Sequence, residues 1–127
     1  MKLLLDTSVL IDVLRARNNR RVLLSQLIRE GHSLSTSVLN IAELYAGMRS
    51  GEEAKTEEFL SALECLDLNA SAARLAGQLK TSWQKKGRTL TLSDTIIAAI
   101  TLEHRCVLLT DNRRDFPMRE ISLYPLP

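Results

Sequence analysis

Aromatic residues are scarce in this chain of 127 residues, at 4% of the sequence. A protein that binds nucleic acid by stacking many bases needs more aromatic faces than this, so the composition argues against a binder of that kind. Hydrophobic residues nevertheless make up 45% and charged residues 25% of the sequence, as in ordinary globular proteins. The length and composition together predict a single domain over residues 1–127, with a core of mostly aliphatic side chains.

Cysteine and histidine are also sparse, with two residues of each. Cys65 and Cys106 are far apart in the sequence, and no Cys-x-x-Cys or Cys/His cluster indicates a zinc site. Two free thiols fit the reducing cytosol. His32 and His104 lie away from the acidic motifs of the chain, which argues against the histidine-based acid–base chemistry of metal-free ribonucleases.

Long apolar runs are absent as well. None approaches the roughly 18 residues that a membrane-spanning helix needs. The N-terminal run Leu3–Leu5 is interrupted at once by Asp6, so it does not have the pattern of a signal peptide. These absences predict a cytoplasmic protein without a membrane partner. The formal net charge of +2 permits a nucleic-acid partner without demonstrating one.

The hydrophobic pattern predicts short apolar strands that alternate with amphipathic helices. Strands are expected at residues 2–5, 32–35, 65–68, 107–110 and 122–124. Helices are expected at about residues 7–15, 20–30, 52–63, 70–86 and 93–104, and another is expected to be capped by Thr36 or Ser37 and to end between residues 47 and 51. This alternation predicts an α/β fold in which helices cover both faces of a short central parallel sheet.

Acidic residues follow two of the expected strands. Asp6 comes directly after the first strand and Asp111 directly after the fourth, with Asp115 four residues further on. Ligand sites in open α/β sheets lie beyond the carboxyl ends of the strands, so these acids are expected at that edge. Glu43 and Asp94 are on flanking helices that can reach the same place. The pattern therefore allows one acidic pocket built from four distant segments.

Clustered carboxylates repel one another unless one is protonated or a cation neutralises them. An all-oxygen site suits Mg²⁺ or Mn²⁺, which are hard cations. Such an ion can activate water and stabilise charge on a phosphate under attack, so the pattern is typical of phosphodiester hydrolysis. The alternative interpretation is that Asp6 and Asp94 only cap helices, which is a frequent role of Asp.

Four segments of the chain resemble the PIN-domain family, and within it the VapC-type toxins. They are Leu5–Asp12, Ala42–Gly47, Asp94–Ala99 and Leu109–Phe116. Each segment is short, but their order and spacing cover almost the whole chain. The resemblance implies a PIN-like fold and a metal-dependent endoribonuclease that cleaves structured RNA such as tRNA. It also implies that the protein is the toxin of a type II (VapBC) toxin–antitoxin pair.

The resemblance further implies which residues form the site. Asp6, Glu43 and Asp94 correspond to the catalytic acids of the family. Asp6 and Asp94 are the expected direct ligands of Mg²⁺ or Mn²⁺, and Glu43 is expected to bind the metal or to orient the attacking water. The implied partners are an RNA substrate, a VapB-like antitoxin that covers the helices near the N-terminus and blocks the acidic pocket, and a second copy of the chain in a homodimer.

The fourth position of the family pattern aligns with Asn112, where the family often has an acid but also tolerates Asn. Asn112 and Asp115 are therefore included among the catalytic candidates, and Asp111 is a neighbour that could substitute. Arg113 and Arg114 flank these acids and are the best candidates for contacts with RNA phosphates.

Two other basic clusters are present. They consist of Arg15, Arg17, Arg20 and Arg21, and of Lys80, Lys85, Lys86 and Arg88. Both could contact phosphates, but runs of charge usually form solvated faces, so a structural role is the expectation for each. Asp12, on the first helix, is also expected to be solvated.

Two other functions remain as alternatives. A receiver-like signalling module has a similar length and an acidic Mg²⁺ pocket. It resembles a pattern with paired acids after the first strand and a lysine after the last core strand, whereas this chain has the single Asp6 and no lysine in Asp111–Arg113. A non-catalytic PIN-like scaffold is the second alternative, and the intact Asp6, Glu43 and Asp94 argue against it.

Overall fold

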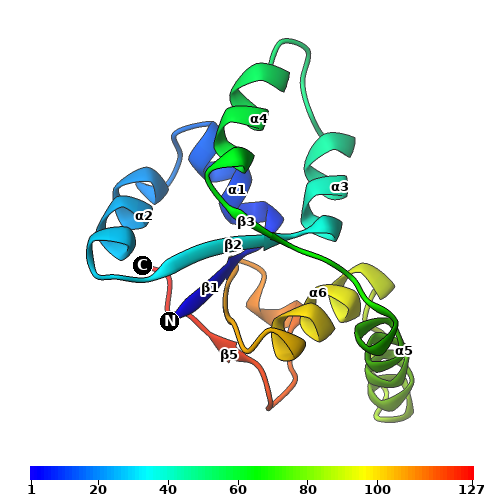
Figure 1. Cartoon of the computed structure of the whole chain (residues 1–127). Helices are drawn as coiled ribbons and strands as arrows, with labels where there is room; N and C mark the ends of the chain where they lie inside the picture. The colour runs from blue at the N-terminus through cyan, green and yellow to red at the C-terminus, as the bar shows by residue number, and fades with distance from the viewer.

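Five short strands form a parallel sheet at the centre of the structure, a computed structural model that describes all residues from 1 to 127 (Figure 1). The strands are β1 (Lys2–Leu5), β2 (Ser33–Ser37), β3 (Glu64–Leu66), β4 (Val107–Leu109) and β5 (Ser122–Leu123). Their order is β3-β2-β1-β4-β5, and every neighbouring pair is parallel. The predicted fold class is confirmed. Receiver-like domains have the strand order 2-1-3-4-5, so this topology excludes that alternative.

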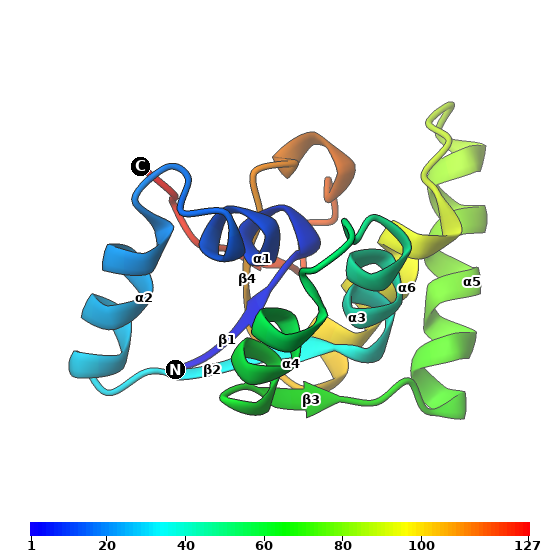
Figure 2. The same cartoon turned by 90° about the horizontal axis from the view of Figure 1, so that it is seen from above.

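Helices cover both faces of the sheet (Figures 1 and 2). They are α1 (Thr7–Leu14), α2 (Arg20–Arg29), α3 (Val38–Ala46), α4 (Glu53–Ser61), α5 (Ala70–Lys85) and α6 (Leu92–Glu103), with a 3-10 turn, η1 (Arg113–Asp115), after β4. Each predicted helix and strand is present, with ends that differ by a few residues. None of these helices has both the length and the apolar character needed to cross a membrane.

One boundary difference lies at the end of β2. This strand continues to Ser37, so Thr36 belongs to the sheet and its hydroxyl donates to the Leu5 carbonyl oxygen over 2.8 Å. Ser37 is the N-cap of α3, because its Oγ accepts a hydrogen bond from the Asn40 backbone N–H. Of the two predicted caps, Ser37 is therefore the correct one.

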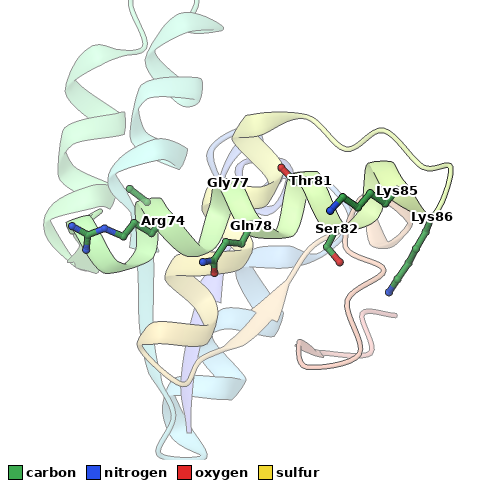
Figure 3. Close-up of a pocket in the computed structure, with 8 residues that line it drawn as sticks. Arg74, Gly77, Gln78, Thr81, Ser82, Lys85 and Lys86 are labelled. Carbon is green, nitrogen blue, oxygen red and sulfur yellow. The ribbon is translucent and has the colours of Figure 1, made fainter.

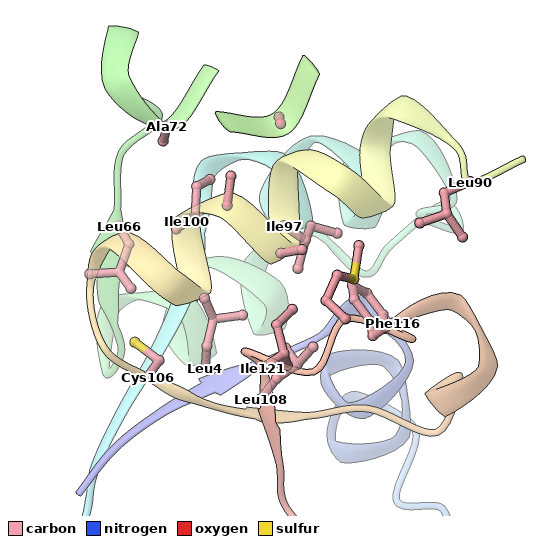
Figure 4. Close-up of a cluster of buried hydrophobic side chains, with 14 residues drawn as sticks. Leu4, Leu66, Ala72, Leu90, Ile97, Ile100, Cys106, Leu108, Phe116 and Ile121 are labelled. Carbon is pink, nitrogen blue, oxygen red and sulfur yellow. The ribbon is translucent and has the colours of Figure 1, made fainter. Parts of the chain in front are cut away.

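β1 and β4 are apolar on both faces because helices cover each side of the sheet. Leu4 and Leu108 belong to a cluster with residues of α5 and α6, which Figure 4 shows in close-up. Leu3, Leu5 and Leu109 point to the other face, where they pack with residues of α1, α2 and α3. Alternate residues of β1 thus anchor both helical layers, which places the end of this strand firmly in the middle of the molecule.

Two predictions about charged residues on the α1–α2 side have different outcomes. Arg20 has a structural role, as expected: it is buried, and its guanidinium donates to the Asp111 carboxylate over 2.8 Å. The prediction for Asp12 was wrong, since its side chain is only 9% exposed. The turn after α1 folds back so that the Asn18 amide donates to the Asp12 carboxylate over 2.8 Å, and this contact replaces water.

The packing of α6 leads to a prediction about stability. Ile100 is fully buried in the cluster of Figure 4, and Ile100→Ala is expected to lower the free energy of unfolding by about 2–5 kcal/mol because it leaves a cavity. Leu92 lies on the same helix but is 53% exposed, so Leu92→Ala should cost less than about 0.5 kcal/mol. Denaturant unfolding of both variants is the measurement, and equal losses would contradict the assigned core.

Candidate active site

Asp6 lies directly beyond the carboxyl end of β1, in the middle of the sheet. The strand order reverses here, because β1 pairs with β2 on one side and with β4 on the other. Asp6 is 4% exposed, and its two carboxylate oxygens accept hydrogen bonds from Asn40 Nδ2 (2.9 Å) and Thr110 Oγ1 (2.6 Å). Asp6 occupies the N-cap position of α1 but makes no side-chain capping bond. Helix capping therefore does not explain this residue.

Asn40 holds the Asp6 carboxylate from α3. It is fully buried, and its amide nitrogen also donates to Thr7 Oγ1 over 3.1 Å, while its amide oxygen accepts from Ser37 Oγ. Sequence reasoning missed Asn40. The available signal was its spacing from Glu43, because residues three apart on a helix share one face.

Glu43 is joined to the same network through Thr7. The Thr7 hydroxyl donates to Glu43 Oε1 over 2.7 Å. Since Asn40 donates to both Asp6 and Thr7, a continuous hydrogen-bond chain connects the two acids. The structure places Thr7 between two predicted site residues.

The segment after β4 orients the site from the other side. The Asn112 backbone N–H donates to Thr110 Oγ1 over 3.0 Å, and that hydroxyl donates to Asp6. The Asn112 side chain is exposed and makes no hydrogen bond within the protein. Asp111 belongs to a different contact, since its carboxylate is paired with Arg20 and its N–H donates to Ser8 Oγ over 3.3 Å.

Asp94 lies in the first turn of α6 and is partly buried. Thr91 is the N-cap of this helix: its hydroxyl oxygen accepts from the Asp94 N–H over 3.1 Å and donates to the Asp94 carboxylate over 2.8 Å. The residue that caps this helix is therefore Thr91, and not Asp94. The carboxylate is held toward the helix N-terminus and the site.

Negative charges on neighbouring acids raise the pKa of Asp6 and of Asp94. Burial raises the pKa of Asp6, and the negative charge of Glu43 adds to it, against the opposing hydrogen bonds from Thr110, the Thr7 backbone and Asn40. Burial also raises the pKa of Asp94; the hydrogen bond from Thr91 opposes the rise, and the charges of Asp115 and Asp6 reinforce it. Repulsion among these acids would fall if a cation were bound between them.

The residues present fit a hard divalent cation that keeps much of its water. None of the four ion pairs in the chain involves the four acids, so no Lys or Arg neutralises them. No three Asp, Glu, His or Cys side chains converge closely enough to hold an ion by themselves. Mg²⁺ is usually bound by one or two carboxylates plus several waters, so this arrangement suits it. The Asp6 carboxylate has about four lone-pair sites and accepts two side-chain hydrogen bonds and one from the Thr7 backbone, so a lone pair remains available.

Arg113 and Arg114, the predicted RNA contacts, are both exposed on η1. The Arg113 guanidinium donates to the Tyr124 carbonyl oxygen over 3.2 Å, which directs it toward the C-terminal segment. Arg114 makes no hydrogen bond or ion pair within the protein, so its charge is available to a ligand. Asp115, at the end of the same turn, is exposed and close enough to raise the pKa of Asp94.

The Thr110 contact leads to a prediction about protonation. The hydroxyl stabilises the charged form of Asp6, so Thr110→Val is expected to raise the pKa of that carboxyl further, because burial is then less opposed. Thr101→Val is the matched control, since that buried hydroxyl donates to the Ile97 carbonyl oxygen. NMR titration of the labelled Asp carboxyl carbons measures the change. An unchanged Asp6 pKa in Thr110→Val would show that the contact does not hold the charge.

Comparison with known proteins places this geometry in a family. A model of the PIN domain matches residues 3–121. Ribonuclease VapC19 of Mycobacterium tuberculosis is 36% identical over 115 residues, which cover 91% of this chain and 92% of the relative. The fold is similar to a structure of VapBC2 from Rickettsia felis bound to a promoter DNA fragment, with a TM-score of 0.87, 24% identity and 98% of each chain covered.

A second solved structure, DNA-bound VapBC from Salmonella typhimurium, has a TM-score of 0.82 and 26% identity, covering 98% of this chain and 97% of the other. The family model covers every acid of the site, and the relative and the two structures cover 91% to 98% of this chain. The chain therefore belongs to the PIN-domain family, as one of its VapC-type members.

Proposed function

We propose that this protein is a metal-dependent endoribonuclease and the toxin of a toxin–antitoxin pair. The observation that carries the proposal is the buried Asp6 carboxylate, held at the sheet edge beside Glu43 and within the field of Asp94, with no cationic side chain to neutralise it. A site of this kind is suited to a divalent cation, and the M. tuberculosis relative is a ribonuclease.

In this proposal Asp6 and Asp94 would hold Mg²⁺ or Mn²⁺ directly, and Glu43 would hold the ion or orient the attacking water. A divalent ion held there would supply a nucleophile at neutral pH and stabilise charge on the phosphate. Asn40, Thr7 and Thr110 fix the carboxylates by hydrogen bonds, so that little rearrangement is needed when an ion enters.

Asp115 is the best candidate for the fourth acid. Its charge acts on Asp94, whereas the Asp111 carboxylate is already paired with the buried Arg20. Asn112 supports the site through its backbone N–H, and its exposed side chain is free to contact the metal-bound water or the substrate. We therefore assign Asp115 and Asn112 to the catalytic site and Asp111 to a structural ion pair.

The proposed substrate is structured RNA such as tRNA, the class that the family resemblance implies. Arg114 is the side chain beside the acids that is most available to a phosphate. A homodimer remains a further expectation, and sedimentation of the purified protein would test it.

The first experiment is cleavage of tRNA and of an unstructured RNA with Mg²⁺ or Mn²⁺. Asp6→Asn and Asp94→Asn are expected to lower the cleavage rate by more than roughly 100-fold, because losing a metal ligand should cost more than losing a residue that only hydrogen-bonds to a ligand. Asp115→Asn should also lower the rate, while Asp111→Asn serves as the matched acid outside the site. Equal effects at the last two positions would contradict the choice of Asp115.

Thermal unfolding of the same variants gives a readout that does not depend on catalysis. Mn²⁺ should raise the unfolding temperature of the parent protein but not that of Asp6→Asn, because binding to the folded state alone is stabilising. Without metal at neutral pH, Asp6→Asn should unfold at a higher temperature than the parent. The folded pKa of Asp6 is raised, so stability falls as the pH rises above 3.8 through that pKa, and Asn avoids this cost. No metal effect in the parent protein would argue against a metal-dependent enzyme.

An apolar groove between α2 and α4 is the proposed binding site for the antitoxin. It has a volume of about 630 Å³ and is lined mainly by hydrophobic side chains, among them Leu24, Ile28, Phe59 and Leu63. Ile28 is 57% exposed although it is large and apolar. A groove of this kind fits the apolar face of a helix from a partner. The resemblance implies an antitoxin on the helices near the N-terminus, and the Salmonella structure is of a VapBC assembly.

This assignment predicts that substitutions at two exposed positions of α2 differ in their effect on antitoxin binding. Ile28→Asp is expected to weaken binding of the cognate antitoxin by roughly 30-fold or more, because a charge would enter an apolar interface. Val22 is 64% exposed on the same helix but does not line the groove, so Val22→Asp is the control. Calorimetric titration with the antitoxin compares the two variants. If Val22→Asp were the more damaging change, the antitoxin would lie elsewhere.

A further inference from the structure

A basic groove extends along the outer face of α5 (Figure 3). Residues 68–93 contain five Lys and Arg residues and no Asp or Glu. The groove has a volume of about 910 Å³, and its lining includes Arg74, Gln78, Lys85 and Lys86 but no acidic side chain. None of these three cations forms an ion pair within the protein. The groove therefore presents positive charge that no other part of the chain neutralises.

The C-terminal end of α5 lies on the same side of the molecule as the acidic site. Ser71 at the start of α5 donates to Glu103 at the end of α6, and Lys80 Nζ donates to the Leu90 carbonyl oxygen just before α6. The two helices are therefore antiparallel, and the end of α5 is near the start of α6, where Asp94 lies. Lys80 is engaged in this contact, so it holds the connection in place and is not counted among the free cations.

A second depression continues the groove around the end of α5. It is lined by Leu79, Ser82, Trp83, Lys86, Arg119 and Glu120. Ser82 and Lys86 also line the first groove. Lys86 Nζ lies 4.5 Å from the centre of the Trp83 ring. Arg119 is exposed, and Glu120 is the one acidic residue of this part. Positive charge and an aromatic face thus occur together beside the site.

We propose that the C-terminal end of α5 binds the phosphate backbone of the RNA substrate as it leaves the acidic site on the Asp94 side. Lys85, Lys86 and Arg119 would contact phosphates. Trp83 packs against the core beneath Lys86, so its indole would report on RNA bound there. Contacts of this kind position a nucleic acid without reading its sequence. The cations lie beyond the acids along the path of the RNA. They would therefore offset the repulsion between the site carboxylates and the RNA phosphates. The inference rests on the proposed ribonuclease function.

The test is RNA binding in the presence of a chelator, so that cleavage does not enter the measurement. Lys85→Gln/Lys86→Gln is expected to bind tRNA about tenfold more weakly and to lower the salt slope of log Kd by roughly 1.4 to 1.8, or about 0.7 to 0.9 for each lost phosphate contact. Lys85→Arg/Lys86→Arg should bind like the parent, because the charges remain. The control pair is Arg29→Gln/Arg105→Asn, two exposed cations that precede β2 and β4 and so lie at the opposite edge of the sheet.

Trp83 provides a second readout, since it is the only tryptophan in the chain. RNA should quench its fluorescence in the parent protein and in the control pair, and should do so only at higher RNA concentration in the Gln pair. Equal affinities and salt slopes for the Gln pair and the control pair would overturn the proposal. So would a loss of self-association in the Gln pair without a loss of RNA binding, which would assign the groove to a second copy of the chain. Binding without any cleavage on adding Mg²⁺ would contradict the proposed enzyme but retain this surface.

Discussion

Burial of the Asp6 carboxylate is the constraint around which the site is organised. Asp6 is only 4% exposed, and a carboxyl group buried in this way would lose its charge unless donors replaced the missing water. Asn40 and Thr110 supply those donors from two different parts of the chain, and Thr7 extends the network to Glu43. Even so, burial and neighbouring negative charge keep the Asp6 pKa above its ordinary value. A bound cation would stabilise the charged form of this acid, and this property links the fold to its proposed chemistry.

The parallel sheet supplies the position that this constraint requires. Because β1 pairs with β2 on one side and β4 on the other, residues after β1 and β4 face each other at the point where the strand order reverses. Leu3, Leu4 and Leu5 anchor both helical layers, so the following Asp6 has little freedom to move. α3 and α6 then bring Glu43 and Asp94 to the same edge. Cavities elsewhere are divided by chemistry: the groove between α2 and α4 is apolar, and the groove on α5 is basic.

Much of the fold could be read from periodicity, because short apolar strands alternate with amphipathic helices and the parallel sheet follows from that alternation. The exact roles of polar residues could not. Asn40 lies within an ordinary helical pattern, and nothing local distinguishes a buried amide that holds a carboxylate from one exposed to solvent. Asp12 was assigned to solvent for the same reason, although the turn after α1 brings Asn18 onto it. Only the position of α3 brings Glu43 and Asn40 onto the Thr7 hydroxyl.

The sequence by itself determined the α/β class, the elements that carry the acids and, through the four family motifs, the expected identity of Asp6, Glu43 and Asp94. These features depend on local pattern and on order along the chain. The tertiary structure decided which side chains meet. It paired Asp111 with Arg20 and brought Asp115 into the field of Asp94. It also placed Lys85 and Lys86 in the lining of a groove beside the site. Such contacts join residues far apart in sequence, so only the packing of the helices on the sheet could fix them.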